Sequence, residues 1–91
     1  MFIIIFTKRR LENYEKIKTL NDIKIRHIDE IGRTISYKGH EVYLWKDHYS
    51  GSINYMFLEN REIKGTHYYT LRDLKNDICE VVNGTHPLHT I

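Results

Sequence analysis

Cysteine and proline are nearly absent from this sequence, which has one residue of each in 91 positions. A single cysteine, Cys79, cannot form an internal disulfide bond, so the sequence does not describe a disulfide-stabilised secreted scaffold. Long apolar runs are absent as well. The longest, residues 1–6, is too short to cross a bilayer, and its neighbouring basic residues follow it, whereas those of a signal peptide precede the apolar segment. We therefore expect a cytoplasmic protein that does not contact a membrane.

A strong excess of charge of one sign is also missing. The chain has 14 lysine and arginine residues against 12 aspartate and glutamate residues, which gives a net charge of +2. This excludes an acidic mimic of nucleic acid, and it is well below the basic density of a dedicated DNA-binding domain. With 41% hydrophobic and 29% charged residues, the composition is that of a globular protein of one domain. Tyrosine is in clear excess, with seven residues, and it suits both half-buried sheets and binding surfaces.

The N-terminal third of the sequence gives mixed signals about secondary structure. Residues 2–7 are mostly β-branched or aromatic and predict a strand, whereas the three-residue spacing of apolar side chains in residues 9–19 predicts a short helix. Residues 23–31 fit both periods, because isoleucines recur there at spacings of two and of three. We expect a strand in the first half of this segment and a turn at residues 29–32.

The middle of the sequence predicts a meander of antiparallel strands. Four segments have the composition or the alternation of strands: residues 34–37, 40–46, 53–58 and 63–69. Lys38-Gly39 is a tight-turn signal after the first segment, and residues 47–51 form a polar loop after the second. Alternation in the second segment puts Val42 and Leu44 on one face, and Tyr43 and Trp45 on the other.

The clearest element is a helix predicted over residues 71–82, whose apolar side chains recur at helical spacing. Thr70 is the predicted N-cap, with Asp73 three residues later in a variant of the capping box. Asn83-Gly84 provides the stop signal, and Pro87 prevents the helix from restarting.

Together these elements predict an α+β fold: a small, mostly antiparallel sheet of four to five strands, with a short N-terminal helix and a C-terminal helix that covers one face. Residues 1–84 form the single domain, and residues 85–91 are a loosely held C-terminal tail. Two helices on one side leave the other side of the sheet open. We expect that open side to carry some of four large side chains, depending on the register: Tyr43, Trp45, Tyr55 and Met56.

No residue pattern points to catalysis, since the sequence has neither a Gly-rich phosphate loop nor a serine, cysteine or paired-carboxylate signature. Cys79, His86 and His89 could provide zinc ligands, but a fourth ligand is missing and the spacing fits no standard finger. A small ribonuclease needs a base, an acid and a cation, which could come from His40, His48, Tyr49, Arg61 and His67. We expect a non-enzymatic protein without metal or cofactor, and keep the ribonuclease as the third hypothesis.

Direct binding of DNA or RNA is the second hypothesis. Residues 40–79 predict three strands and a helix, a layout that resembles three-stranded-sheet DNA-binding domains such as those of the integrase arm-binding type. This resemblance implies a sheet that faces nucleic acid, with Trp45 pointing outward. The order of elements over residues 11–82 also resembles the double-stranded RNA-binding domain. The phosphate contacts would come from these residues: Lys8, Arg9, Arg10, Lys46, Lys64, Arg72 and Lys75.

The whole chain resembles the small accessory proteins of bacteriophages and mobile elements. The resemblance rests on a length near ninety residues, on richness in Ile, Lys, Asn and Tyr, and on the lack of a catalytic motif. It implies an inhibitor, similar in style to anti-CRISPR proteins, that acts in the host cytoplasm on a host or defence protein or nucleoprotein complex. The leading hypothesis is therefore a binding protein with exposed aromatic and basic anchors, which we predict to be Tyr43, Trp45, Tyr49 and Arg61. An edge strand could also pair with a second copy and form a homodimer.

Overall fold

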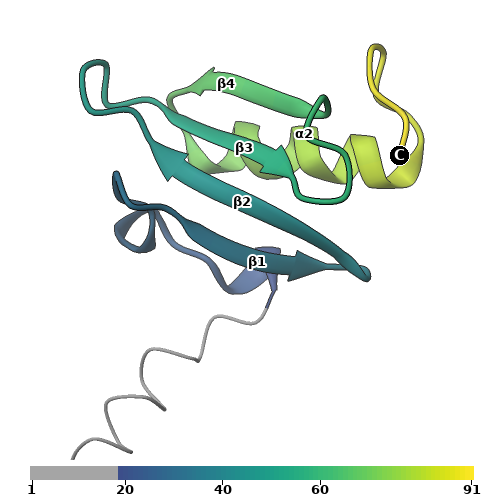
Figure 1. Cartoon of the computed structure of the whole chain (residues 1–91), viewed down its shortest axis with the longest axis horizontal. Coiled ribbons are helices and arrows are strands. Elements are labelled where there is room, and N and C mark those ends of the chain that lie inside the picture. Colours follow the sequence, from purple (N-terminus) through teal and green to yellow (C-terminus); the bar gives the residue numbers. More distant parts are fainter. Residues whose placement is uncertain (1–18) are drawn as a thin grey trace, which may run out of the picture.

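A four-stranded antiparallel sheet forms the centre of the protein (Figure 1). The computed structural model describes residues 19–91, and the strands within them lie side by side in chain order. The elements are β1 (Arg33–Tyr37), β2 (His40–Lys46), β3 (Ile53–Phe57), β4 (Lys64–Tyr68) and α2 (Leu71–Asn83). This architecture confirms the predicted α+β class. The strand predicted at residues 2–7 lies outside the described residues, and so does the helix predicted at residues 9–19 except for Thr19.

The hairpin between β1 and β2 follows the turn signal in the sequence. Tyr37 pairs with His40, which leaves Lys38 and Gly39 as a two-residue turn. Both have positive φ, +49° and +83°, as a type I′ turn requires. Because the twist of such a turn matches the twist of the strands, it sets the register of the whole hairpin.

Alternation along the strands sorts the side chains between the two faces of the sheet. Val42 and Leu44 are fully buried on the face that packs against α2, whereas Tyr43 lies on the opposite face and is half-buried. Met56 pairs with Tyr43 and shares that opposite face. Of the four side chains considered for the open side, Tyr55 is the one that the register places in the core, because it pairs with Leu44 and is fully buried.

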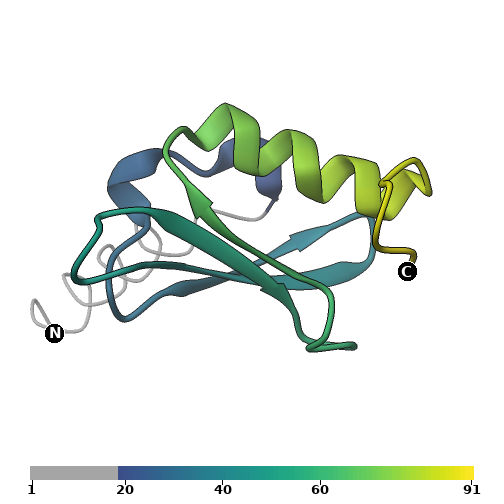
Figure 2. The ribbon, with the colours of Figure 1, turned by 90° about the horizontal axis from the view of Figure 1, so that it is seen from above.

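Helix α2 packs across one face of the sheet (Figure 2). It begins as predicted after Thr70, whose hydroxyl accepts a hydrogen bond from the backbone N–H of Asp73 (3.2 Å). Its fully buried residues are Leu74, Ile78 and Val81. The helix ends one residue later than predicted and is followed by Gly84 in the left-handed conformation. No helix within residues 19–91 is long and apolar enough to cross a bilayer.

Residues 20–28 pack on the same face of the sheet as α2 (Figure 2). They form two 3-10 turns, η1 (Leu20–Asp22) and η2 (Ile25–His27). The strand predicted in the first half of residues 23–31 is therefore wrong. The backbone closes short local hydrogen bonds instead, such as the one from the His27 N–H to the Lys24 carbonyl (2.9 Å).

The isoleucine spacing in this region has a tertiary cause. Ile23 and Ile28 are both buried in the core, whereas Ile25 between them is exposed. The buried positions follow neither the period of a strand nor that of a helix, because the segment is irregular. The predicted turn at residues 29–32 is confirmed, because the Gly32 N–H donates to the Asp29 carbonyl (3.2 Å).

After Gly84 the chain turns back along the end of α2. The backbone N–H groups of Thr85 and His86 both donate to the Glu80 carbonyl, at 2.9 and 3.2 Å. The side chain of His86 is only 7% exposed. The segment predicted as a loose tail therefore has one well-packed residue, which no signal in the sequence indicated.

Candidate binding surface

The face of the sheet opposite α2 is covered by no element within residues 19–91 (Figures 1 and 2). We call it the open face. Strand register places eight side chains on it: Thr34, Ser36, Glu41, Tyr43, Trp45, Asn54, Met56 and Lys64. Tyr43 and Trp45 stack on each other, with ring centroids 5.4 Å apart and ring planes 19° apart. Two of the four predicted partner-binding residues thus lie together on this face.

The stacked pair is held in place by the loop that precedes β1. The Tyr43 hydroxyl donates a hydrogen bond to the carbonyl of Ile31 (2.5 Å). The ring also lies against Gly32, where a Cβ would come 2.2 Å from the hydroxyl oxygen and where φ is +88°. Because the ring is already ordered, a partner that contacts it loses little side-chain entropy on binding.

A hollow of about 230 Å³ lies beside Trp45 on the open face. The buried Asn54 organises it: the amide nitrogen donates to the carbonyls of Trp45 and Ser52 (3.5 Å each), and the oxygen accepts from the backbone N–H of His67 (2.9 Å). His67 has a φ of +67° and lies where the pairing of β3 with β4 is irregular. The hollow is completed by Asp47 and Thr66.

The loop between β2 and β3 is closed by its own hydrogen bonds. One carboxylate oxygen of Asp47, Oδ2, accepts from both the backbone N–H and the hydroxyl of Ser50 (3.0 and 2.6 Å). The backbone N–H of Gly51 donates to the Asp47 carbonyl (3.0 Å). This loop presents Tyr49, which is 94% exposed. A large aromatic residue is therefore held out from a well-bonded loop.

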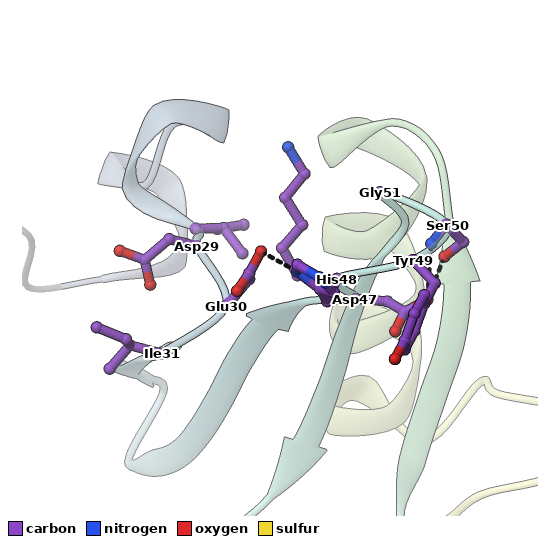
Figure 3. A pocket seen from close by; sticks show the side chains of 10 residues that line it. Asp29, Glu30, Ile31, Asp47, His48, Tyr49, Ser50 and Gly51 are labelled. Atoms are coloured by element: carbon purple, nitrogen blue, oxygen red, sulfur yellow. Dashed lines mark hydrogen bonds and ion pairs between the residues drawn. The ribbon is translucent and has the colours of Figure 1, made fainter.

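A groove of about 630 Å³ opens at this end of the sheet, between residues 28–31 and the β2–β3 loop (Figure 3). The ring nitrogen Nδ1 of His48 lies 2.6 Å from the Glu30 carboxylate, so this pair links the two walls. Ile31 on one wall is 84% exposed, and Tyr49 lies on the other. We call this feature the sheet-end groove. It offers two apolar side chains to a partner on either side of a polar centre.

The structure separates the fourth predicted anchor from the other three. Tyr49 lies in the β2–β3 loop, next to the point where Lys46 pairs with Ile53. Arg61 lies in the connection between β3 and β4. Successive connections of an antiparallel meander lie at alternate ends of the sheet. Arg61 is therefore at the far end, away from the sheet-end groove.

The basic residues of the nucleic-acid hypothesis are scattered in the part of the chain that the structure describes. The cluster at residues 8–10 lies outside it. Lys64 lies on the open face, whereas alternation along β2 puts Lys46 on the side of α2. Arg72 and Lys75 lie in the first two turns of α2, and the Lys75 ammonium group donates to a backbone carbonyl (3.0 Å). These four residues do not form one phosphate-binding surface.

The residues of the ribonuclease hypothesis are also divided between the two ends of the sheet. His40 starts β2 and forms an ion pair or hydrogen bond with Glu59 in the β3–β4 connection. His48 pairs with Glu30 at the opposite end. The geometry therefore brings together no base, acid and cation from that set of residues.

A partly buried polar cluster that sequence reasoning missed lies between the sheet and α2. The carboxylate oxygen Oδ2 of Asp77 accepts from the hydroxyls of Tyr55 and Tyr68, the latter at 2.6 Å, while Oδ1 lies 2.8 Å from Nε2 of His86. Burial opposes ionisation of Asp77, but the hydrogen bonds from Tyr55, Tyr68 and His86 outweigh it and lower the pKa. Burial and the hydrogen bond to Asp77 raise the pKa of both tyrosines, so they remain donors.

Asp77 and His86 also lie near Glu80, with potential metal-ligand atoms within 4.8 Å of one another. The ring nitrogen Nδ1 of His86 accepts the backbone N–H groups of Leu88 and His89, each at 3.1 Å. The proton of the neutral ring is therefore on Nε2, which donates it to Asp77. A metal ion would need the lone pair of Nε2. The ring is thus arranged as a structural hydrogen-bond donor, and not as a ligand.

The zinc ligands considered from the sequence are directed elsewhere. The sulfur of Cys79 donates to the Tyr37 hydroxyl (3.3 Å), and among residues 19–91 no group of three metal-ligating residues includes it. His86 and His89 stack on each other with ring centroids 5.1 Å apart. Their contacts stabilise the tail.

A scan of protein-family models, a search of curated proteins and a search of solved structures each found no match for this chain. The open face and the sheet-end groove are therefore the features that bear on function.

Proposed function

We propose that this chain is a non-enzymatic binding protein that holds a protein or nucleoprotein partner on its open face and sheet-end groove. The proposal is supported by the positions of Tyr43, Trp45 and Tyr49 towards one end of the sheet, with Ile31 across the groove. Binding hot spots are enriched in tryptophan and tyrosine, whose large and rigid side chains lose little entropy on association.

The exposure of Tyr49 is the observation that carries this proposal. Its side chain is almost fully exposed, although the loop beneath it is closed by hydrogen bonds of Asp47 and Ser50. Burial of an exposed aromatic ring against a partner contributes through the apolar area removed from water. A large side chain held outward in this way favours a binding role over a role in the stability of the fold.

The class of partner follows from charge and from the resemblance to bacteriophage accessory proteins. Of the four basic residues that the structure describes from the nucleic-acid set, only Lys64 lies on the open face, whereas Arg72 and Lys75 lie together at the start of α2. They do not form one surface with Lys64, which disfavours a phosphate backbone as the main ligand. The resemblance points to a host or defence protein as the target of inhibition, in the host cytoplasm. We therefore propose a protein surface as the primary contact.

The test is partner capture with the immobilised full-length chain, from a lysate treated with nuclease. We expect a retained protein whose recovery falls at least about tenfold with Tyr49→Ala, the usual loss at a hot spot. Arg61→Ala is the matched control, because it removes another exposed side chain at the far end of the sheet. The proposal would be contradicted if the wild type, Tyr49→Ala and Ile31→Asp all recovered the same amount of the partner protein.

Nucleic-acid binding remains the alternative, because Trp45 does lie on the open face of the sheet. It is tested by titrating labelled duplex DNA, single-stranded DNA and RNA at low and at physiological salt. Affinity that falls steeply with salt, and whose salt dependence decreases when Lys8, Arg9 and Arg10 are neutralised, would support it.

A further inference from the structure

A line of three side chains crosses the open face towards the sheet-end groove. Tyr43, Trp45 and Asp47 occupy every second position, and side chains two apart in a strand point to the same face. Asp47 follows the last residue of β2 but continues the ladder, because its backbone N–H donates to the Ser52 carbonyl (2.8 Å). Tyr43 therefore stacks on one side of Trp45, and Asp47 follows Trp45 at the hollow.

The carboxylate of Asp47 is negatively charged and keeps room for another donor. Both hydrogen bonds from Ser50 end on Oδ2, so Oδ1 retains accepting capacity. Hydrogen bonds from the Ser50 hydroxyl and backbone lower the pKa of Asp47, so it is ionised at neutral pH. Among residues 19–91 no salt bridge involves Asp47.

The other charges of the open face are further away along the strands. Lys64 pairs with Met56, which lies two residues along β3 from Asn54. Glu41 pairs with Ser36 and lies near the opposite end of β2 from Asp47. The hollow is therefore lined by an indole ring, one carboxylate, the neutral polar side chains of Asn54 and Thr66, and the imidazole of His67. This combination is complementary to a flat cation.

We propose that the hollow binds the guanidinium group of an arginine side chain of the protein partner, stacked on Trp45 and paired with Asp47. The inference rests on the proposed function and names the chemistry of the partner at that surface. Guanidinium is planar, stacks on aromatic rings and forms two parallel hydrogen bonds with a carboxylate. A lysine ammonium group could form the ion pair with Asp47 but would not stack on Trp45 as a planar group does. A nucleotide stacked on Trp45 would bring its negatively charged phosphates close to the carboxylate of Asp47, which is unfavourable.

The experiment uses the full-length chain and the fluorescence of Trp45, which is the only tryptophan. The probes are a short blocked peptide with one arginine and the same peptide with citrulline, which keeps the shape but removes the charge. We expect a saturable change in fluorescence with the arginine peptide and at least about threefold weaker binding of the citrulline peptide, the loss of one exposed charge pair. A lysine peptide should bind more weakly than the arginine peptide.

Two variants locate the effect. Asp47→Asn keeps an acceptor for Ser50 and should weaken arginine binding about threefold or more. Glu62→Gln, which removes a carboxylate from the β3–β4 connection, is the matched control and should bind like the wild type. If Asp47→Asn does not fold, amide and indole N–H shifts in nuclear magnetic resonance spectra of the wild-type protein decide. Arginine-specific shifts at Trp45 and His67 support the inference, and shifts confined to other regions oppose it.

Equal affinity for the arginine and citrulline peptides would overturn the inference. So would quenching of Trp45 by an RNA oligonucleotide that becomes stronger in Asp47→Asn, since this would identify a nucleic acid as the ligand. If the arginine peptide does not bind while partner capture still depends on Tyr49, this inference fails and the proposed function stands. If Tyr49-dependent capture is also absent, both fail.

Discussion

At the scale of single residues, Gly32 combines a close side-chain contact with a positive φ, so that even one added methyl group is expected to disturb Tyr43. Gly32→Ala introduces a Cβ that would collide with Tyr43 at a backbone φ of +88°. We expect a loss of about 2–3 kcal/mol in the free energy of unfolding, measured by urea denaturation, because strain and a displaced ring add. Gly39→Ala is the control, since it has a similar φ of +83° but nothing within 4 Å of the new Cβ. The same loss in both variants would contradict a role of Gly32 in positioning Tyr43.

Asp77 is the residue whose ionisation contributes most clearly to stability. Its pKa in the folded state is below the ordinary value of 3.8, so its contribution is complete above that value and is lost as the pH falls through the lower folded pKa. We expect Asp77→Asn to lose about 1–3 kcal/mol at pH 7 and to show a weaker loss of stability than wild type below pH 4. Urea denaturation between pH 2.5 and 7 measures both effects.

The control for this prediction is Glu62→Gln, which removes an exposed carboxylate from a loop. It should leave the stability at pH 7 nearly unchanged. A pH dependence of Asp77→Asn that is identical to that of wild type would mean that the cluster of Tyr55, Tyr68 and His86 does not favour the ionised form of Asp77.

Sequence reasoning could place the predicted aromatic anchors Tyr43 and Trp45 on one face of the sheet, but not the polar residues around them. Alternation predicts that Tyr43 and Trp45 share a face, since this depends only on the period of a strand. Asp47 was not singled out, and His67 was considered only for a ribonuclease. Their positions beside Trp45 depend on loop closure and on an irregularity in the pairing of β3 with β4, which bring distant residues together. Tyr55 carries the same alternation signal as a surface tyrosine, and only its hydrogen bond to Asp77 makes burial of the hydroxyl favourable.

At the scale of elements, the signals that proved correct are local in sequence. The turn at Lys38-Gly39 and the N-cap at Thr70 each act within four residues, so the sequence contains the whole interaction. Residues 20–28 are different, because their shape follows from the burial of Ile23 and Ile28 against a sheet built by later residues. The isoleucine spacing from which we expected a strand therefore belongs to a segment that forms two 3-10 turns.

The β1–β2 turn provides a prediction at this scale. Lys38 has a φ of +49°, which asparagine adopts at lower cost, and Asn-Gly is the preferred pair for a type I′ turn. Lys38→Asn should raise the free energy of unfolding by about 0.5–1 kcal/mol in a urea titration. The substitution also removes a hydrogen bond from the Lys38 ammonium group to Asn83 (3.2 Å), whose separate effect Asn83→Ala measures. If Lys38→Asn does not raise the free energy of unfolding once the effect of Asn83→Ala has been subtracted, the turn is not strained at Lys38.

At the scale of the whole molecule, the contacts of residues 85–91 with α2 are expected to contribute to the stability of the domain. Termination after residue 84 removes the hydrogen bond of His86 to Asp77 and two donors to the Glu80 carbonyl. We expect the shortened chain to fold with the same far-ultraviolet circular dichroism but to be about 1–3 kcal/mol less stable in urea. Termination after residue 89 keeps these contacts and is the control. Equal stability of all three chains would show that the whole tail is loosely held.

The strand order has a consequence for the way the chain reaches its fold. Within residues 19–91, each strand after β1 pairs with the strand that precedes it in sequence, so these pairings close short loops at low entropic cost. We expect rapid folding in which the hairpins form first and α2 docks last. Until that docking, Val42, Leu44 and Tyr55 remain in contact with water on a sheet that lacks its helix. A chain interrupted during synthesis before α2 would therefore be the most aggregation-prone species that this protein passes through.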